Sequence, residues 1–253
     1  MRSKKSLGQH WLTSVGAINK IIESANLKIR EIVLEIGPGQ GVLTKALLDR
    51  GVVVIAVEKD RDLIVQLKQK FAREIAVKQL QLVEGDILNF KLTTIYKIVA
   101  NIPYNITGAI IEKFLTAKNQ PRSMTLLVQK EVAERIVAKD SKESILSLSV
   151  KVFGTPKYIQ TVKAGSFNPP PKVDSAILQI TNISRNKFKT SKTTEEKFFR
   201  VVKTGFAHKR KTIANNLNWS KLDFDQLGVC GVRPTDRAED LALDQWFCLA
   251  RNI

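Results

Sequence analysis

The amino-acid sequence predicts an α/β protein with a doubly wound, seven-stranded sheet and a small all-helical domain at its C-terminal end. Short apolar runs of β-favouring residues alternate with segments whose apolar residues recur at helical spacing, which is typical of strands joined by crossover helices. After residue 180 the strand pattern stops and only helical patterns follow. At 253 residues the chain is long enough for both parts to bury a core.

The predicted elements follow one another in a regular order. Strands are expected at residues 32–36, 52–57, 80–83, 98–100, 124–128, 145–153 and 173–180, with helices at 17–25, 42–49, 63–72, 109–115 and 131–137. Four more helices are expected at residues 196–206, 210–217, 222–227 and 238–251, with Trp219 and Trp246 in their core. A polar segment precedes these four helices. We therefore predict domains over residues 1–182 and 196–253, joined by a linker over 183–195.

The net charge of +17 points to a polyanionic partner. Nucleic acid is the expected one, although an anionic membrane surface, or a basic protein with no such partner, would have the same composition. No stretch of the sequence has the length of a membrane span, and the basic N-terminus is not followed by the apolar region of a signal peptide. We therefore expect no membrane partner.

The two cysteines, Cys230 and Cys248, are too few to form a disulfide framework. A single disulfide is conceivable, but reduced thiols in a cytoplasmic protein are the simpler interpretation. The sequence therefore predicts a cytoplasmic location.

A glycine-rich loop, Gly37-Pro38-Gly39-Gln40-Gly41, follows the first strong strand and leads into a helix. Gly37 and Gly39 can let backbone amides approach a ligand at the helix N-terminus. A dinucleotide fingerprint needs its third glycine where Val42 stands, so the spacing favours a nucleoside ligand without a pyrophosphate and disfavours a nicotinamide-dependent oxidoreductase. A plain tight turn is the alternative.

Acidic residues stand at the ends of the next two strands. Glu58 is placed to accept both hydroxyls of a ribose, and Asp86 to accept a hydrogen bond from an adenine amine while Ile87 packs on the ring. A surface glutamate and a Gly85-Asp86 turn are the alternatives. Together with the glycine loop, these strand ends predict a nucleoside site at the carboxyl edge of the sheet.

The fourth strand ends in Asn101-Ile102-Pro103-Tyr104, a sequence suited to methylation of a base amine. Such an amine is a poor nucleophile because its lone pair is delocalised into the ring. The Asn101 side-chain oxygen and the Ile102 carbonyl, held out by the rigid Pro103, would favour the pyramidal amine, and Tyr104 would stack on a base turned out of its helix. A structural Asn-Pro turn is the alternative.

With these loops, the sequence resembles the ribosomal RNA adenine dimethyltransferase family over nearly its whole length. The resemblance implies a Rossmann-like methyltransferase fold and S-adenosylmethionine as cofactor, which Asn101 would also contact. The segment 6–12 is similar to the family's N-terminal cofactor motif, so His10 and Leu12 are expected beside the methionine part, although the family usually has Asn and Phe where this chain has His10 and Trp11. In the proline-rich segment 167–175, Phe167 would stack on the target adenine opposite Tyr104.

The resemblance also implies the substrate: two adjacent adenosines near the 3′ end of small-subunit (16S) ribosomal RNA, dimethylated on N6 during subunit biogenesis. Lys209, Arg210 and Lys211 in a basic helix would contact phosphates, unless they form an ordinary solvated face. We expect no metal site, because His10 and His208 lie in different predicted domains, and we expect a monomer. The alternatives are methylation of large-subunit RNA or of DNA, and an assembly factor whose binding matters more than its methylation.

Overall fold

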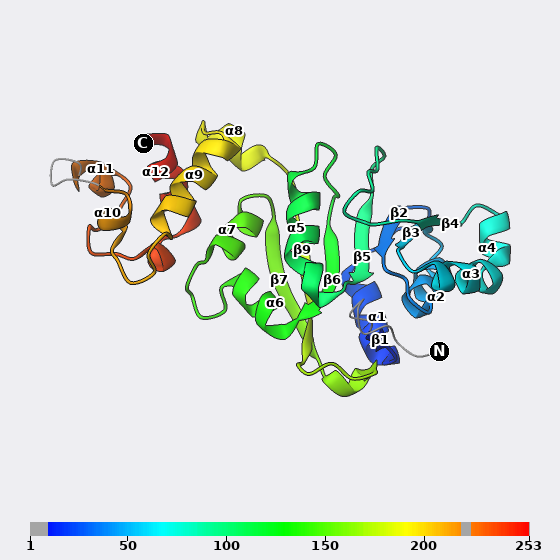
Figure 1. Cartoon of the computed structure of the whole chain (residues 1–253). Coiled ribbons are helices and arrows are strands. Elements are labelled where there is room, and N and C mark those ends of the chain that lie inside the picture. Colours follow the sequence, from blue (N-terminus) through cyan, green and yellow to red (C-terminus); the bar gives the residue numbers. More distant parts are fainter. Residues whose placement is uncertain (1–9, 219–223, 253) are drawn as a thin grey trace. The chain divides into compact units, whose positions relative to one another are not determined.

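The computed structural model describes residues 10–218 and 224–252, with the side chains of 224–226 left aside (Figure 1). The chain forms two compact units, residues 1–133 with 156–183, and residues 134–155 with 184–253. The predicted N-terminal motif is described only from His10 onward, and Trp219 lies outside the described residues. In the described part of the chain, no helix combines the length and the apolar character needed to cross a membrane.

A seven-stranded sheet forms the centre of the first unit. Its strands are β2 (Ile32–Ile36), β3 (Val53–Glu58), β4 (Leu80–Glu84), β5 (Lys97–Asn101), β6 (Met124–Gln129), β7 (Thr155–Val162) and β9 (Ser175–Thr181). They lie in the order β4-β3-β2-β5-β6-β9-β7, with β4 to β6 parallel and β9 antiparallel to β6. The chain direction along the sheet reverses between β2 and β5, and ligands bind at the carboxyl ends of strands at such a point.

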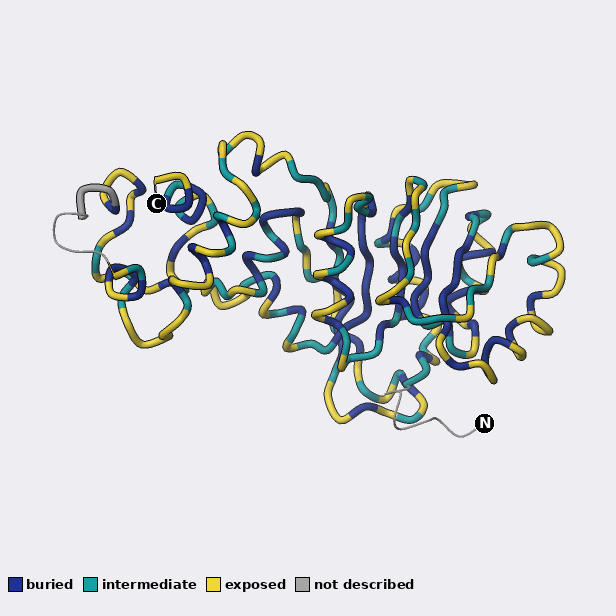
Figure 2. The backbone as a smooth tube through the Cα atoms, turned by 45° about the horizontal axis from the view of Figure 1, so that its top comes forward, coloured by how far each residue is buried: buried dark blue, intermediate teal, exposed yellow. Residues whose placement is uncertain are grey.

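Helices follow the strands as crossover connections. They are α1 (Val15–Ser24), α2 (Val42–Asp49), α3 (Arg61–Lys70), α4 (Ala72–Ala76), α5 (Thr107–Thr116) and α6 (Lys130–Val137). Side-chain oxygens begin two of them, since Ser14 accepts from the Ala17 amide and Asp60 from the Asp62 amide. The central strands are buried along most of their length (Figure 2), which explains why they read as continuous apolar runs.

A separate two-stranded sheet joins the beginning of the described chain to its proline-rich loop. Strand β1 (Trp11–Leu12) pairs antiparallel with β8 (Phe167–Asn168), so that Leu12 stands opposite Phe167. Both side chains are buried and belong to the core cluster of the first unit. The pairing therefore brings β1 to the same unit as the sheet.

The α/β fold class is confirmed, but one predicted strand is wrong. Residues 145–153 alternate between apolar and polar character, yet residues Ile145–Lys151 form helix α7. Ser144 begins this helix with a capping box in which its side chain and that of Ser147 each accept from the other's backbone amide. The capping interactions override the alternating pattern, and the seventh strand is β7 instead.

The second unit consists of helices around an aromatic core. Besides α7 it contains α8 (Asn186–Ser191), α9 (Glu195–Gly205), α10 (Ile213–Asn216), α11 (Phe224–Val229) and α12 (Leu243–Asn252). Phe153, Phe188, Phe198 and Phe247 pack with ring centroids 4.7 to 5.9 Å apart, and Trp246 is fully buried as expected. The predicted linker over 183–195 thus contains helix α8, because Phe188 finds an aromatic environment.

The structure contradicts the expectation of reduced thiols. Cys230 and Cys248 form a disulfide, with their Cα atoms 5.5 Å apart. Helix α12 carries Cys248 past the turn that follows α11, and this separation lies within the range that a disulfide spans. The bond therefore connects two elements of the helical unit.

Two glycines of the loop before α2 differ in what surrounds them, which leads to a prediction. Gly41 has φ +76°, and a Cβ there would lie 2.5 Å from Phe71 Cε2 and 2.8 Å from Leu67 Cδ2. We expect Gly41→Ala to lower the free energy of unfolding by about 3 kcal/mol, because left-handed strain and overpacking add. Gly37 has φ +63° but no atom within 4 Å of such a Cβ.

Gly37→Ala is therefore the matched control, with an expected loss of about 1 kcal/mol from backbone strain alone. Urea unfolding of the two variants and the parent measures both losses. Equal losses would contradict the packing that we describe around Gly41.

Candidate active site

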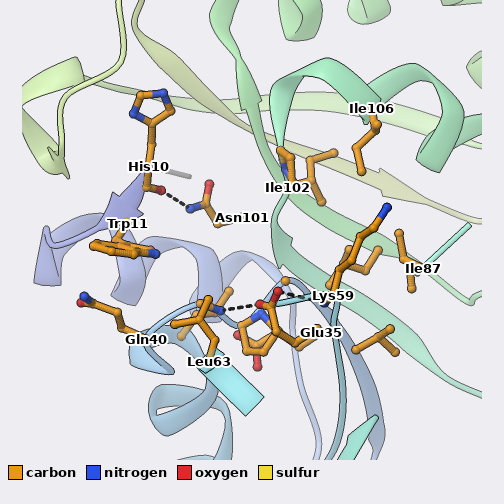
Figure 3. A pocket seen from close by; sticks show the side chains of 18 of the residues that line it. His10, Trp11, Glu35, Gln40, Lys59, Leu63, Ile87, Asn101, Ile102 and Ile106 are labelled. Carbon is orange, nitrogen blue, oxygen red and sulfur yellow. Dashed lines mark hydrogen bonds between the residues drawn. The ribbon is translucent and has the colours of Figure 1, made fainter. Parts of the chain in front are cut away.

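A cavity of about 270 Å³ lies at the carboxyl ends of β2, β3, β4 and β5 (Figure 3). Every predicted cofactor residue lines it, together with four of the predicted catalytic residues: His10, Leu12, Gly37, Gly39, Glu58, Asp86, Ile87, Asn101, Ile102, Pro103 and Tyr104. These residues come from β1, from the glycine loop and from three further strand ends. The fold thus brings together residues that are widely separated in the sequence.

The glycine amides of the loop are already bonded within the chain. Gly37 N donates to Val57 O at 2.9 Å, Gly39 N to Glu58 Oε2 at 3.2 Å, and Gly41 N to Pro38 O at 2.9 Å. We expected such amides to approach a ligand directly. Instead, two of them fasten the loop to the end of β3, and a ligand must rely on other donors or exchange with these bonds.

Glu58 is held rigidly at the end of β3. Its Oε1 accepts from the backbone amides of Lys59 and Asp60, each at 2.9 Å, and its Oε2 accepts from Gly39 N. Burial raises the pKa of Glu58, although the three amides act in the opposite direction. Since each carboxylate oxygen can accept more than one hydrogen bond, Glu58 remains able to accept from hydroxyl groups.

Asp86 shares its carboxylate with a lysine. Its Oδ1 accepts from Leu88 N at 2.9 Å, and its Oδ2 lies 2.9 Å from Lys59 Nζ. The Leu88 amide and then Lys59 lower the pKa of Asp86, so it is ionised at neutral pH. Ile87 beside it is buried. An amine that binds Oδ2 must share it with Lys59, a residue that the sequence reasoning did not identify.

Glu35 is a second residue that the sequence reasoning missed. It is 1% exposed at the end of β2, and its Oε2 has no hydrogen-bond partner in the described chain. Burial raises the pKa of Glu35 to about 8, and the nearby charge of Glu58 acts in the same direction. A glutamate inside the apolar run Ile-Val-Leu-Glu-Ile was the available signal, because such a residue is seldom buried unless it has a function.

Asn101 connects the catalytic loop to β1. Its Nδ2 donates to the backbone carbonyl of His10 at 3.1 Å (Figure 3), which leaves Oδ1 as an acceptor at the cavity. Pro103 O accepts from Ile106 N at 3.3 Å, which begins a short 3₁₀ helix, Tyr104–Ile106. The loop is thus fixed at both ends, and Ile102 between them is buried.

The predicted aromatic clamp is only half assembled. Tyr104 lines the cavity, and its hydroxyl lies 2.6 Å from Ser175 Oγ. Phe167 does not line the cavity, because it is 4% exposed and faces the core beside Leu12 and Ile177. Phe167 would have to leave the core to reach a base, so its stacking role stays a prediction.

The imidazole of His10 faces the acceptor side of the cavity rather than the glycine loop. Its Nδ1 donates to Pro169 O at 2.8 Å, and its ring lies 6.0 Å from the Tyr104 ring at an interplanar angle of 20°. Figure 3 shows this ring directed away from Gln40. The contact of His10 with the Asn101 side of the cavity is made by its backbone.

The predicted basic residues lie in the helical unit. Lys209, Arg210 and Lys211 are exposed, but they occupy the turn between α9 and α10 instead of a helix. Asn216 holds this turn, since its Nδ2 donates to Gly205 O at 2.7 Å and to His208 O at 3.1 Å. Helix α10 begins only after Thr212, whose side chain accepts from the Asn215 amide. Among the described residues, no three His, Cys, Asp or Glu side chains cluster as they would around a metal ion.

A family model described as "Ribosomal RNA adenine dimethylase" matches residues 1–253. The chain belongs to this family. The resemblance inferred from the motifs is therefore confirmed, together with the methyltransferase fold and the assignment as an enzyme.

Named relatives of this dimethylase are similar over almost their whole length. A "Ribosomal RNA small subunit methyltransferase A" of Dehalococcoides mccartyi is 42% identical over 98% of this chain and 88% of the relative. The protein of the same name from Rippkaea orientalis is 42% identical over 99% and 97%. Both relatives carry the name of a small-subunit enzyme.

Two solved structures share the fold of this dimethylase across both units. A dimethyladenosine transferase from Plasmodium falciparum has a TM-score of 0.82 at 28% identity, covering 95% of this chain and 96% of that one. The 23S rRNA methyltransferase ErmE has a TM-score of 0.78 at 26% identity, covering 95% and 98%. The fold is therefore common to enzymes named for different ribosomal RNAs.

The raised pKa of Glu35 leads to a prediction about stability. The unfolded chain releases this proton near pH 4.5, whereas the folded chain keeps it until about pH 8. The folded state therefore binds the proton more tightly, and Glu35 reduces stability progressively as the pH rises from 4.5 to 8. Glu35→Gln keeps the shape without the titration, so we expect it to remove a loss of up to about 1.4 kcal/mol per pH unit.

Urea unfolding of the parent and of Glu35→Gln at several pH values between 5 and 8 measures this difference. The gap between the two free energies of unfolding should widen in favour of the variant as the pH rises. Parallel curves would mean that Glu35 ionises at its ordinary pH in the folded protein.

Proposed function

We propose that this chain dimethylates the N6 amine of two adjacent adenosines near the 3′ end of small-subunit ribosomal RNA, with S-adenosylmethionine as methyl donor. The observation that carries the proposal is the placement of Asn101. It stands at the end of β5, beside the glycine-loop cavity, with Nδ2 anchored on His10 O and Oδ1 left as an acceptor. A base amine brought to this position would meet an acceptor next to a nucleoside site.

The cavity residues fit S-adenosylmethionine, whose sulfonium supplies an activated methyl group. Glu58 would accept from the ribose hydroxyls, while Asp86 would accept from the adenine amine and Ile87 would pack on its ring. Two shielded polar atoms without partners, Glu35 Oε2 and Trp11 Nε1, also belong to cavity residues. These orphaned atoms suit a ligand that carries both donors and acceptors, because buried polar groups are normally paired.

The chain's contribution to the reaction is mainly positioning. The Asn101 side-chain oxygen and the Ile102 carbonyl accept from the two hydrogens of the amine and favour its pyramidal form. Tyr104, fixed by Ser175, stacks on one face of the flipped base. A strong base is not required, because the amine becomes acidic as it bonds to the methyl group and its proton passes to water.

Similarity and charge support the small subunit as substrate. Identity is 42% to relatives named for small-subunit RNA and 26% to an enzyme named for 23S RNA. The net charge of +17 supplies affinity for phosphates, to which Lys209, Arg210 and Lys211 would contribute. Such a substrate would place the enzyme where ribosomes assemble, the cytoplasm of a bacterial cell.

Asn101→Ala tests the catalytic assignment. We expect kcat to fall by about 100-fold or more, because the variant removes an acceptor that acts on the reacting amine. The affinity for S-adenosylhomocysteine should fall only modestly, and calorimetry of this binding shows that the fold and the cofactor site persist. Unchanged turnover would exclude Asn101 from catalysis.

The substrate is tested by nucleoside mass spectrometry. The protein and S-adenosylmethionine are incubated in parallel with unmethylated small subunits, large subunits, naked ribosomal RNA and DNA. We expect N6-dimethyladenosine with small subunits. Product only on large-subunit RNA or DNA would overturn the proposed substrate, and tight small-subunit binding without product would favour an assembly factor.

A further inference from the structure

Trp11 carries a hydrogen-bond donor that the described chain leaves unused. Its Nε1 is shielded from water and has no acceptor among the described residues. Trp11 lines the cavity, and Figure 3 shows its indole above the glycine loop with the nitrogen-bearing edge toward the middle of the site. This edge approaches Gly39 closely, since Cδ1 and Nε1 lie 3.1 and 3.3 Å from where a Cβ of residue 39 would stand.

Other donors at this end of the cavity are already engaged. The amides of Gly37, Gly39 and Gly41 donate to acceptors within the chain. Lys70 Nζ donates to Gln40 O at 2.8 Å, and Lys59 Nζ pairs with Asp86. An anionic group beside the glycine loop would therefore find no free lysine among these described contacts, and the indole is the shielded donor that remains.

The unused donor has a counterpart on the same cavity. Glu35 Oε2 is shielded and unpaired, as the Trp11 donor is. One orphaned donor and one orphaned acceptor match an α-amino acid group, whose carboxylate accepts and whose ammonium donates. The adenosine half of the ligand is already accounted for by Glu58, Asp86 and Ile87.

We propose that the Trp11 indole N–H donates to the methionyl carboxylate of the cofactor and so selects for ligands that carry this group. The inference rests on the proposed use of S-adenosylmethionine. Phenylalanine, usual for the family at this position, has the ring but no donor, so the interaction is a property of this chain. Trp11 acts in binding and takes no part in the transfer itself.

Calorimetry with Trp11→Phe tests the proposal, because phenylalanine keeps an aromatic ring and removes the N–H. The ligands are S-adenosylhomocysteine and its decarboxylated analogue. We expect Trp11→Phe to weaken S-adenosylhomocysteine roughly tenfold and to leave the affinity for the decarboxylated analogue nearly unchanged. Equal losses for both ligands would show a packing role and overturn the proposal, as would an unchanged affinity for S-adenosylhomocysteine.

Trp246→Phe is the matched control, since Trp246 Nε1 is likewise buried without an acceptor in the described chain but lies in the helical unit. We expect this variant to bind both ligands as the parent does. A tenfold loss there would remove the assignment to Trp11.

A measurement on the parent protein keeps the proposal testable if Trp11→Phe fails to fold. In ¹⁵N-labelled protein, the indole resonance of Trp11 should shift when S-adenosylhomocysteine is added and should not shift in the same way with the decarboxylated analogue. Identical shifts would overturn the proposal. If the parent binds neither ligand, the proposed cofactor itself is wrong, which is a different failure from that of Trp11.

Discussion

The parallel pairing of β2 with β5 is the constraint on which the active site depends. Val33 stands opposite Lys97 and Leu34 opposite Ile98, so the two strands end side by side. One end continues into the glycine loop and the other into Asn101. The donor of the methyl group and its acceptor must meet within bonding distance, and this register is what brings their two loops together. Residues elsewhere in the cavity refine a geometry that the sheet has already imposed.

The electrostatics of the cavity oppose those of the whole molecule. The chain carries a net charge of +17, yet Glu35, Glu58 and Asp86 gather at the carboxyl ends of three adjacent strands. A basic protein attracts a polyanion over long distances, whereas short-range acidic groups favour a cationic sulfonium ligand. The partial neutralisation of Glu35 by its raised pKa limits the repulsion among these carboxyls in the ligand-free state. Separate charge distributions can thus serve the two substrates.

The sequence was sufficient for features that arise locally and insufficient for those that depend on distant pairing. Glu58, Asp86 and Asn101 could be placed because an apolar run that ends in a polar residue marks the end of a parallel strand. The helix within 145–153 was missed because two serine caps outweigh a pattern of alternation. The burial of Phe167 could not be foreseen, since it follows from pairing with a strand near the other end of the chain.

Strand β1 contacts both halves of the reaction, although it has only two residues. The carbonyl of His10, just before it, accepts from Asn101, and the imidazole of the same residue stacks beside Tyr104 on the acceptor side. Trp11 turns its indole to the glycine loop on the cofactor side. A ligand that moves either ring must therefore act on one short segment of backbone. We infer that β1 is where occupancy of the cofactor site is communicated to the loop that positions the base amine, because no other described strand lines both sides so closely.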